Sequence, residues 1–229
     1  MQIDQINSAI TNFCYDLQDR IKPKCFDMMT EKELIVELIN CILGSNVKYE
    51  MSITYAYLIG EYLECLDTSE IINADFDKKI SLMLSSKAIN QVIGKEFNSY
   101  RFPNRASTNI HKTISNIKSR YGTVSKLIQS FSDYRKLRLE LVNICYGIGP
   151  KQASHFLKNI GFTDNIAIID SHILNYLKLN NNCIPLTYNV STIKNYESIE
   201  EIFISQARES FSFPISLVDQ SIWFIMRNI

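Results

Sequence analysis

The sequence predicts an all-α protein, and three observations support this fold class. Apolar residues recur at helical spacing through most of the 229 residues. Alternating patterns typical of strands are limited to two short, isolated segments, 165–169 and 183–190. The chain contains only seven glycines, which is few for a fold with many tight turns or Gly-rich loops.

The helices follow in order along the chain. After an N-terminal helix, the apolar pattern over 33–43 stops at Gly44, and the pattern over 106–121 stops at Gly122. A final helix over 216–226 follows the breaker Pro214 and begins with Ser216-x-x-Asp219, the spacing of a capping box. Between them, the periodicity predicts helices over 133–146, 150–160, 172–177 and 196–211.

Composition and charge exclude several function classes. The chain has 24 basic and 24 acidic residues, and its apolar content of 46% excludes a disordered chain. A zero net charge excludes a polybasic tail, but it does not exclude nucleic-acid binding, because phosphates respond to a local patch. We expect a cytoplasmic protein with no membrane partner and with six reduced cysteines, since no membrane span, secretory signal or zinc-ligand cluster is recognisable.

The segment 141–161 has the pattern of a helix–hairpin–helix motif. One helix runs into Gly147 and Gly149, Pro150 suits the first position of a second helix, and Gly161 suits the position after its end. The two hairpin glycines allow a tight turn and leave backbone N–H groups uncovered beside a helix N-terminus. This arrangement is suited to binding a DNA phosphate.

Three side chains near the hairpin suggest chemistry. Lys151 falls in the first helical turn, where the positive end of the helix dipole favours the neutral, nucleophilic amine. Asp170 and His172 follow the apolar run 166–169. Simpler interpretations exist for each: Lys151 as a phosphate-contacting or solvated residue, Asp170 as an N-cap, His172 as a partly buried histidine. Their combination with the hairpin favours the functional interpretation.

These residues resemble the helix–hairpin–helix DNA glycosylase superfamily. The segments GIGPKQASHFLKNIGF and AIIDSHIL are most similar to the second type of 8-oxoguanine DNA glycosylase/AP lyase, which is known mainly from archaea and some bacteria. Weaker similarity extends over ELINCILGSN at 37–46, YRFPNRA at 100–106, and the Asp219 and Trp223 pair of the last helix.

The resemblance implies a role for each matching residue. Lys151 is implied as the nucleophile that attacks the sugar, and Asp170 as the residue that activates that step. The implied DNA-binding residues are Gly147, Gly149, His172, Arg105 and Asn46, the last filling the gap left by the flipped nucleotide. The implied base pocket contains Trp223, Asp219 and Phe156, with the capping box as the competing interpretation of Asp219.

The resemblance also implies an architecture and partners. We expect two helical subdomains, one over 26–137 and one formed by 1–25 with 138–229, with the active cleft and the hairpin at their junction. The implied partner is double-stranded DNA with a modified base, bound by a monomer in the prokaryotic cytoplasm and nucleoid. No organic cofactor is expected, although relatives often hold a monovalent cation at the hairpin. No iron–sulfur cluster is expected either, because only Cys183 follows Asp170.

The function implied first is a bifunctional glycosylase/AP lyase that removes 8-oxoguanine through a lysine Schiff base and then nicks the strand. The family pattern continues past its tryptophan to Thr-Gly and a near-terminal lysine, whereas FIMRNI follows Trp223 here. One alternative is therefore a glycosylase for a different base, including a hypermodified base in defence against foreign DNA. The other is a non-catalytic helix–hairpin–helix DNA-binding module.

Overall fold

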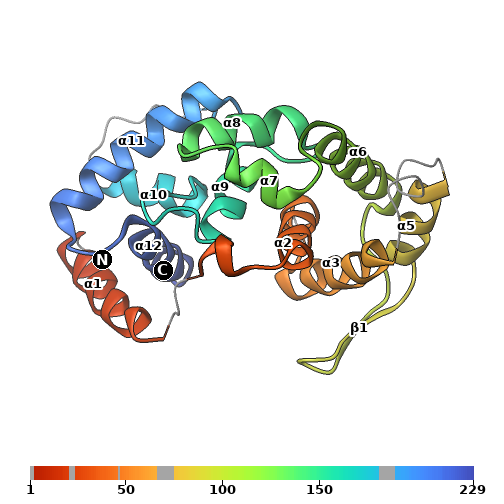
Figure 1. The fold of residues 1–229 in the computed structure, drawn as a ribbon. Helices are drawn as coiled ribbons and strands as arrows, with labels where there is room; N and C mark the ends of the chain where they lie inside the picture. Colours follow the sequence, from red (N-terminus) through yellow and green to blue (C-terminus); the bar gives the residue numbers. More distant parts are fainter. Residues whose placement is uncertain (1–2, 21–23, 46, 66–74, 181–188) are drawn as a thin grey trace. The chain divides into compact units, whose positions relative to one another are not determined.

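The computed structural model of the protein describes residues 3–20, 24–45, 47–65, 75–180 and 189–229 (Figure 1). This part of the chain is predominantly helical, with eleven α-helices, one short 3-10 helix and one two-stranded antiparallel sheet. The prediction of an all-α protein is confirmed. No helix within these described ranges has the length and apolar character that a membrane span requires.

The chain divides into two compact units. The first, called here the terminal unit, consists of Met1–Lys24 and Gly149–Ile229; the second, the middle unit, consists of Cys25–Ile148. The boundary expected from the sequence, after residue 137, lies eleven positions before the boundary in the structure, after Ile148. The helix at 134–144 belongs to the middle unit because it packs on the helix at 103–121, where Asn116 Nδ2 donates to the Ile144 carbonyl at 2.8 Å.

The middle unit consists of consecutive helices and one small hairpin. Its elements are η1 (Phe26–Met28), α2 (Glu31–Leu43), α3 (Tyr49–Glu64), α5 (Asp75–Ser85), β1 (Ala88–Asn90), β2 (Lys95–Phe97), α6 (Pro103–Tyr121), α7 (Val124–Gln129) and α8 (Tyr134–Ile144). Helix α2 ends before Gly44 and α6 before Gly122, as predicted. The β1–β2 hairpin was not predicted, because each strand has only three residues.

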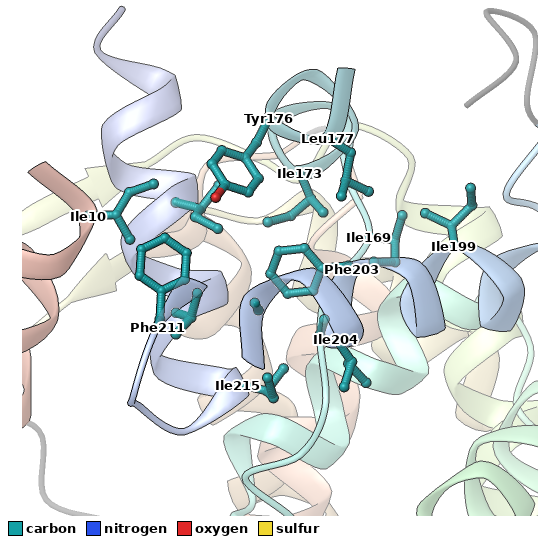
Figure 2. Packing of buried hydrophobic residues seen from close by; sticks show 14 of the residues in the cluster. Ile10, Ile169, Ile173, Tyr176, Leu177, Ile199, Phe203, Ile204, Phe211 and Ile215 are labelled. Carbon is teal, nitrogen blue, oxygen red and sulfur yellow. The ribbon is translucent and has the colours of Figure 1, made fainter. Parts of the chain in front are cut away.

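The terminal unit joins the first helix of the chain to the last four. Its helices are α1 (Ile3–Gln18), α9 (Pro150–Asn159), α10 (Ser171–Leu179), α11 (Ile193–Ser210) and α12 (Ile215–Arg227). The apolar faces of α1, α10, α11 and α12 meet in one core, which includes Ile10, Tyr176, Phe203 and Ile215 (Figure 2). Ile169, from the segment before α10, packs in the same core.

The structure decides two local points in the terminal unit. Helix α12 begins after Pro214 without a side-chain cap, so the capping box expected from Ser216 and Asp219 does not form. The segment 165–169 is not a strand but an irregular connection between α9 and α10. The other candidate strand, 183–190, lies largely outside the described residues.

Candidate active site

The first hairpin glycine is required by the fold. Gly147 has a φ of +80°, a backbone conformation that side chains with a Cβ rarely adopt. A Cβ at this position would lie 2.6 Å from Asn109 Nδ2 on α6. The preceding Tyr146 donates its backbone N–H to Thr113 Oγ1 at 2.9 Å, so the start of the hairpin is held against α6.

The second hairpin glycine has no such requirement. Gly149 is the N-cap of α9, with an extended backbone (φ −100°, ψ −177°) that any residue adopts. A Cβ there would meet only Gln152 Oε1, at 3.4 Å. Because Gly149 provides no capping side chain, it leaves the positive N-terminus of α9 open to an anion. Neither the backbone conformation nor the surrounding space therefore requires a glycine at position 149.

Lys151 is exposed in the first turn of α9, directly after Pro150 at the first helical position. The opposite face of this helix is buried through Ala153 and Leu157. The helix ends as predicted: Gly161 has a φ of +70° and donates to the Lys158 carbonyl, while Phe162 donates to the Leu157 carbonyl. The sequence therefore fixes both ends of the helix that carries the candidate nucleophile.

Asp170 is the N-cap of α10. Its Oδ1 atom accepts hydrogen bonds from the backbone N–H groups of His172 at 2.9 Å and Ile173 at 3.1 Å. The simple interpretation as a cap is thus realised, and it involves only one of the two carboxylate oxygens. Lys151 and Asp170 both belong to the terminal unit. Lys151 lies at the N-terminal end of α9, and Asp170 at the N-terminal end of α10.

His172, two residues after Asp170, lies against Trp223 of α12. Their rings are 6.1 Å apart in an edge-to-face arrangement, and the indole is 37% exposed. The guanidinium of Arg227 lies 4.9 Å from the Trp223 ring centroid, a cation–π distance. Trp223 therefore presents a partly exposed aromatic ring that contacts α10 through His172.

Asp219 is the partner of a largely buried lysine and does not cap α12. Its carboxylate is buried, with Oδ2 accepting from Lys158 Nζ at 2.8 Å and Oδ1 from the Ile168 backbone N–H at 3.1 Å. Burial raises the pKa of Asp219, and the nearby charge of Asp170 adds to that rise; Lys158 and the Ile168 N–H group oppose it. Asp219 therefore connects α12, α9 and the segment before Asp170.

The other predicted site residues lie in three kinds of position. Phe156 has no exposed surface and is a core side chain in this structure. Arg105 is exposed on α6 in the middle unit. Asn46 lies outside the described residues. Over the described ranges, His, Cys, Asp and Glu do not form a group of three or more that could hold a metal ion.

Two polar residues near the site were missed by the sequence analysis. Tyr196 and Glu200 on α11 are fully buried and bind the backbone of the segment that leads to Asp170. Their spacing of four residues, on a helix face otherwise formed by apolar residues such as Phe203, is the signal that could have identified them.

Comparison with known proteins identifies relatives of this chain. The family model described as 8-oxoguanine DNA glycosylase (Ogg-HhH) matches residues 20–211. A relative from Sulfolobus acidocaldarius, named 8-oxoguanine DNA glycosylase/AP lyase, is 32% identical over 194 residues, covering 84% of this chain and 81% of its own. The relative of the same name from Methanocaldococcus jannaschii is 31% identical over 202 residues, covering 88% and 84%.

Solved structures agree with this relationship. The crystal structure of Methanocaldococcus jannaschii 8-oxoguanine DNA glycosylase superposes with a TM-score of 0.69 at 27% identity, covering 99% of this chain and 94% of that one. The M. jannaschii enzyme in complex with 15mer DNA containing 8-oxoguanine gives a TM-score of 0.62 at 27% identity, covering 99% and 91%. The predicted resemblance is confirmed, and the chain belongs to the 8-oxoguanine DNA glycosylase family.

Proposed function

We propose that this protein is a bifunctional DNA glycosylase/AP lyase that removes 8-oxoguanine from double-stranded DNA. The observation that carries the proposal is that one unit holds both an exposed Lys151 in the first turn of α9 and the Asp170 carboxylate at the start of α10. The names of its relatives support the same activity. The hairpin before Lys151 supplies the means of binding the DNA backbone.

Lys151 acts as the nucleophile in this proposal. Its neutral amine attacks C1′ of the damaged nucleoside, and the N-glycosidic bond breaks as the base leaves with the bonding electron pair and takes up a proton. The amine loses two protons in all: one balances the proton taken up by the base, and the other goes to the ring oxygen O4′ as its bond to C1′ breaks and the sugar opens to an imine. The strand is then cut by β-elimination, which removes a proton from C2′ and breaks the C3′–O bond. The negative charge of Asp170 stabilises the positive charge that develops on the sugar during base release.

The DNA backbone binds at the open N-terminus of α9. A phosphate is attracted there by the helix dipole and by the N–H groups of a helix whose N-cap, Gly149, has no side chain, and Gly149 allows it to approach closely. The partly exposed ring of Trp223, which contacts His172, is the proposed platform for the extruded base. Arg105 and Asn46 are proposed to contact the duplex from the middle unit.

Borohydride trapping on an 8-oxoguanine duplex tests the lyase chemistry, because reduction of the imine leaves a stable protein–DNA bond. The wild type should form the adduct and Lys151→Gln should not. Lys178→Gln is the matched control, since Lys178 is also exposed on a helix of the terminal unit but lies in the last turn of α10. Loss of the adduct in both variants, or in neither, would contradict the role of Lys151.

The Asp170→Asn variant separates charge from capping. Asparagine caps a helix about as well as aspartate, so α10 should persist while base release slows about 100-fold or more. DNA affinity should remain near that of the wild type.

A duplex panel with several modified bases identifies the substrate. Preference for another base would revise the specificity, and salt-dependent DNA binding without an adduct on any lesion or abasic site would identify a non-catalytic module.

A further inference from the structure

The segment 166–169 leads directly into Asp170 and has no regular secondary structure. Ile166, Ala167 and Ile169 are nevertheless almost completely buried. Buried backbone N–H groups require partners, and no strand lies beside this segment in the described part of the chain. Its hydrogen bonds therefore have to be supplied in another way.

Side chains supply them, one for each of three consecutive N–H groups. Glu200 Oε1 accepts from Ala167 at 3.2 Å, Asp219 Oδ1 from Ile168 at 3.1 Å, and Tyr196 Oη from Ile169 at 2.9 Å. The Tyr196 hydroxyl also donates to the Ala167 carbonyl at 3.1 Å. The segment is thus bound on every residue from 167 to 169.

The arrangement of these partners follows the geometry of extended backbone, in which successive groups point to opposite sides. Ala167 and Ile169 bind Tyr196 and Glu200, which are four residues apart on one face of α11, whereas Ile168 binds Asp219 on α12. The two helices replace the neighbouring strands of a sheet. All three accepting residues are buried, so water does not compete for these bonds.

Asp219 extends the connection to the helix of the candidate nucleophile. Its second oxygen binds Lys158 Nζ at 2.8 Å, and Lys158 lies two helical turns after Lys151 on α9. The side chains of this ion pair are only 14% and 4% exposed. One buried carboxylate therefore holds both α9 and the segment that ends at Asp170.

We propose that Tyr196, Glu200 and Asp219 are positioning residues that fix the Asp170 carboxylate relative to Lys151. The inference rests on the proposed function, and it reassigns Asp219 from the base pocket to the support of the catalytic groups. These side chains do not touch DNA; they immobilise the backbone from which Asp170 projects. Base release, which needs Asp170 in place, depends on them, whereas binding of the duplex does not.

Tyr196→Phe tests this role, because it removes the hydroxyl that binds both Ile169 and Ala167 and keeps the ring. In single-turnover base release from an 8-oxoguanine duplex, the maximal rate should fall about 10- to 100-fold, with an unchanged half-saturating protein concentration. Tyr176→Phe is the matched control: Tyr176 is also fully buried in the terminal unit, but its hydroxyl binds Asn7 at 2.9 Å. It should keep the wild-type rate at a temperature where both variants are folded.

Each outcome of this comparison decides the proposal. The proposal is overturned if Tyr196→Phe keeps the wild-type maximal rate of base release, or if both variants lose that rate equally. It is also overturned if Tyr196→Phe changes only the half-saturating protein concentration. A wild type that neither releases base nor traps an adduct would refute the proposed function and the positioning role with it. An active wild type with an unaffected Tyr196→Phe would refute the positioning role alone.

Hydrogen exchange in the wild type provides a test that needs no variant. The amides of Ala167, Ile168 and Ile169 should be protected from exchange although they lie outside helices and strands, because each is bound by a buried side chain. Exchange as fast as in exposed loops would show that the segment is not immobilised, and it would overturn the proposal even if Tyr196→Phe does not fold.

Discussion

Substituting alanine at each hairpin glycine in turn should separate folding from phosphate binding. At Gly147 the φ of +80° costs an alanine about 1–2 kcal/mol, and its Cβ would also displace Asn109, whose Nδ2 would be 2.6 Å away. We therefore expect Gly147→Ala to lower the free energy of unfolding by about 1–3 kcal/mol. For a chain of this size, each kcal/mol corresponds to a decrease in Tm of about 2–4 °C.

At Gly149 the same substitution should leave stability nearly unchanged. The backbone is extended, and the new Cβ would touch only Gln152 Oε1 at 3.4 Å. The methyl group would instead stand where the phosphate approaches the α9 N–H groups. Since a hydrogen bond to a charged group contributes about 1.5–3 kcal/mol, the affinity for DNA should fall about 10-fold or more.

Thermal unfolding and titration of a labelled 8-oxoguanine duplex at fixed salt measure the two effects on the same preparations. The expected pattern is a lower Tm for Gly147→Ala and weaker binding at an unchanged Tm for Gly149→Ala. If Gly149→Ala binds DNA like the wild type, or loses as much stability as Gly147→Ala, the assignment of the α9 N-terminus to the phosphate is refuted.

Three further predictions concern stability and reactivity. Asp133→Ala removes the N-cap of α8 and should lower the free energy of unfolding by about 1 kcal/mol at neutral pH. Backbone hydrogen bonds lower the pKa of Asp133, so this loss should vanish as pH falls through that pKa. Urea unfolding of both proteins at two pH values measures it. Asp219→Asn should cost about 3 kcal/mol or more, because it removes the negative charge that pairs with the largely buried Lys158 ammonium. An unchanged free energy of unfolding would contradict this. In a Cys183→Ser variant, a thiol reagent should label Cys25 and Cys65 in the native protein and the three buried thiols only after denaturation.

Features decided by local chemistry were predictable from the sequence. Gly122 and Gly161 end their helices because a positive φ is accessible to glycine at these positions. Pro150 begins α9 because a proline at the first helical position loses no hydrogen bond. The candidate catalytic residues were identifiable for the same reason, since the hairpin, Lys151 and Asp170 lie close together in the sequence.

Features decided by distant partners were not predictable. The Ser216-x-x-Asp219 spacing suggested a local cap, but Lys158 and the Ile168 N–H group, 61 and 51 residues away, bind the carboxylate instead. The support of the segment before Asp170 by Tyr196 and Glu200 spans 27 and 33 residues. Such contacts depend on how helices pack, which a periodic pattern along one helix does not specify.

The most direct test of the central claim is to identify the residue that bonds to DNA. The wild-type protein would be trapped with borohydride on an 8-oxoguanine duplex, digested, and analysed by mass spectrometry. The proposed function predicts a single modified peptide with the reduced sugar adduct on Lys151. An adduct on any other residue, or no adduct when base release is complete, would contradict it.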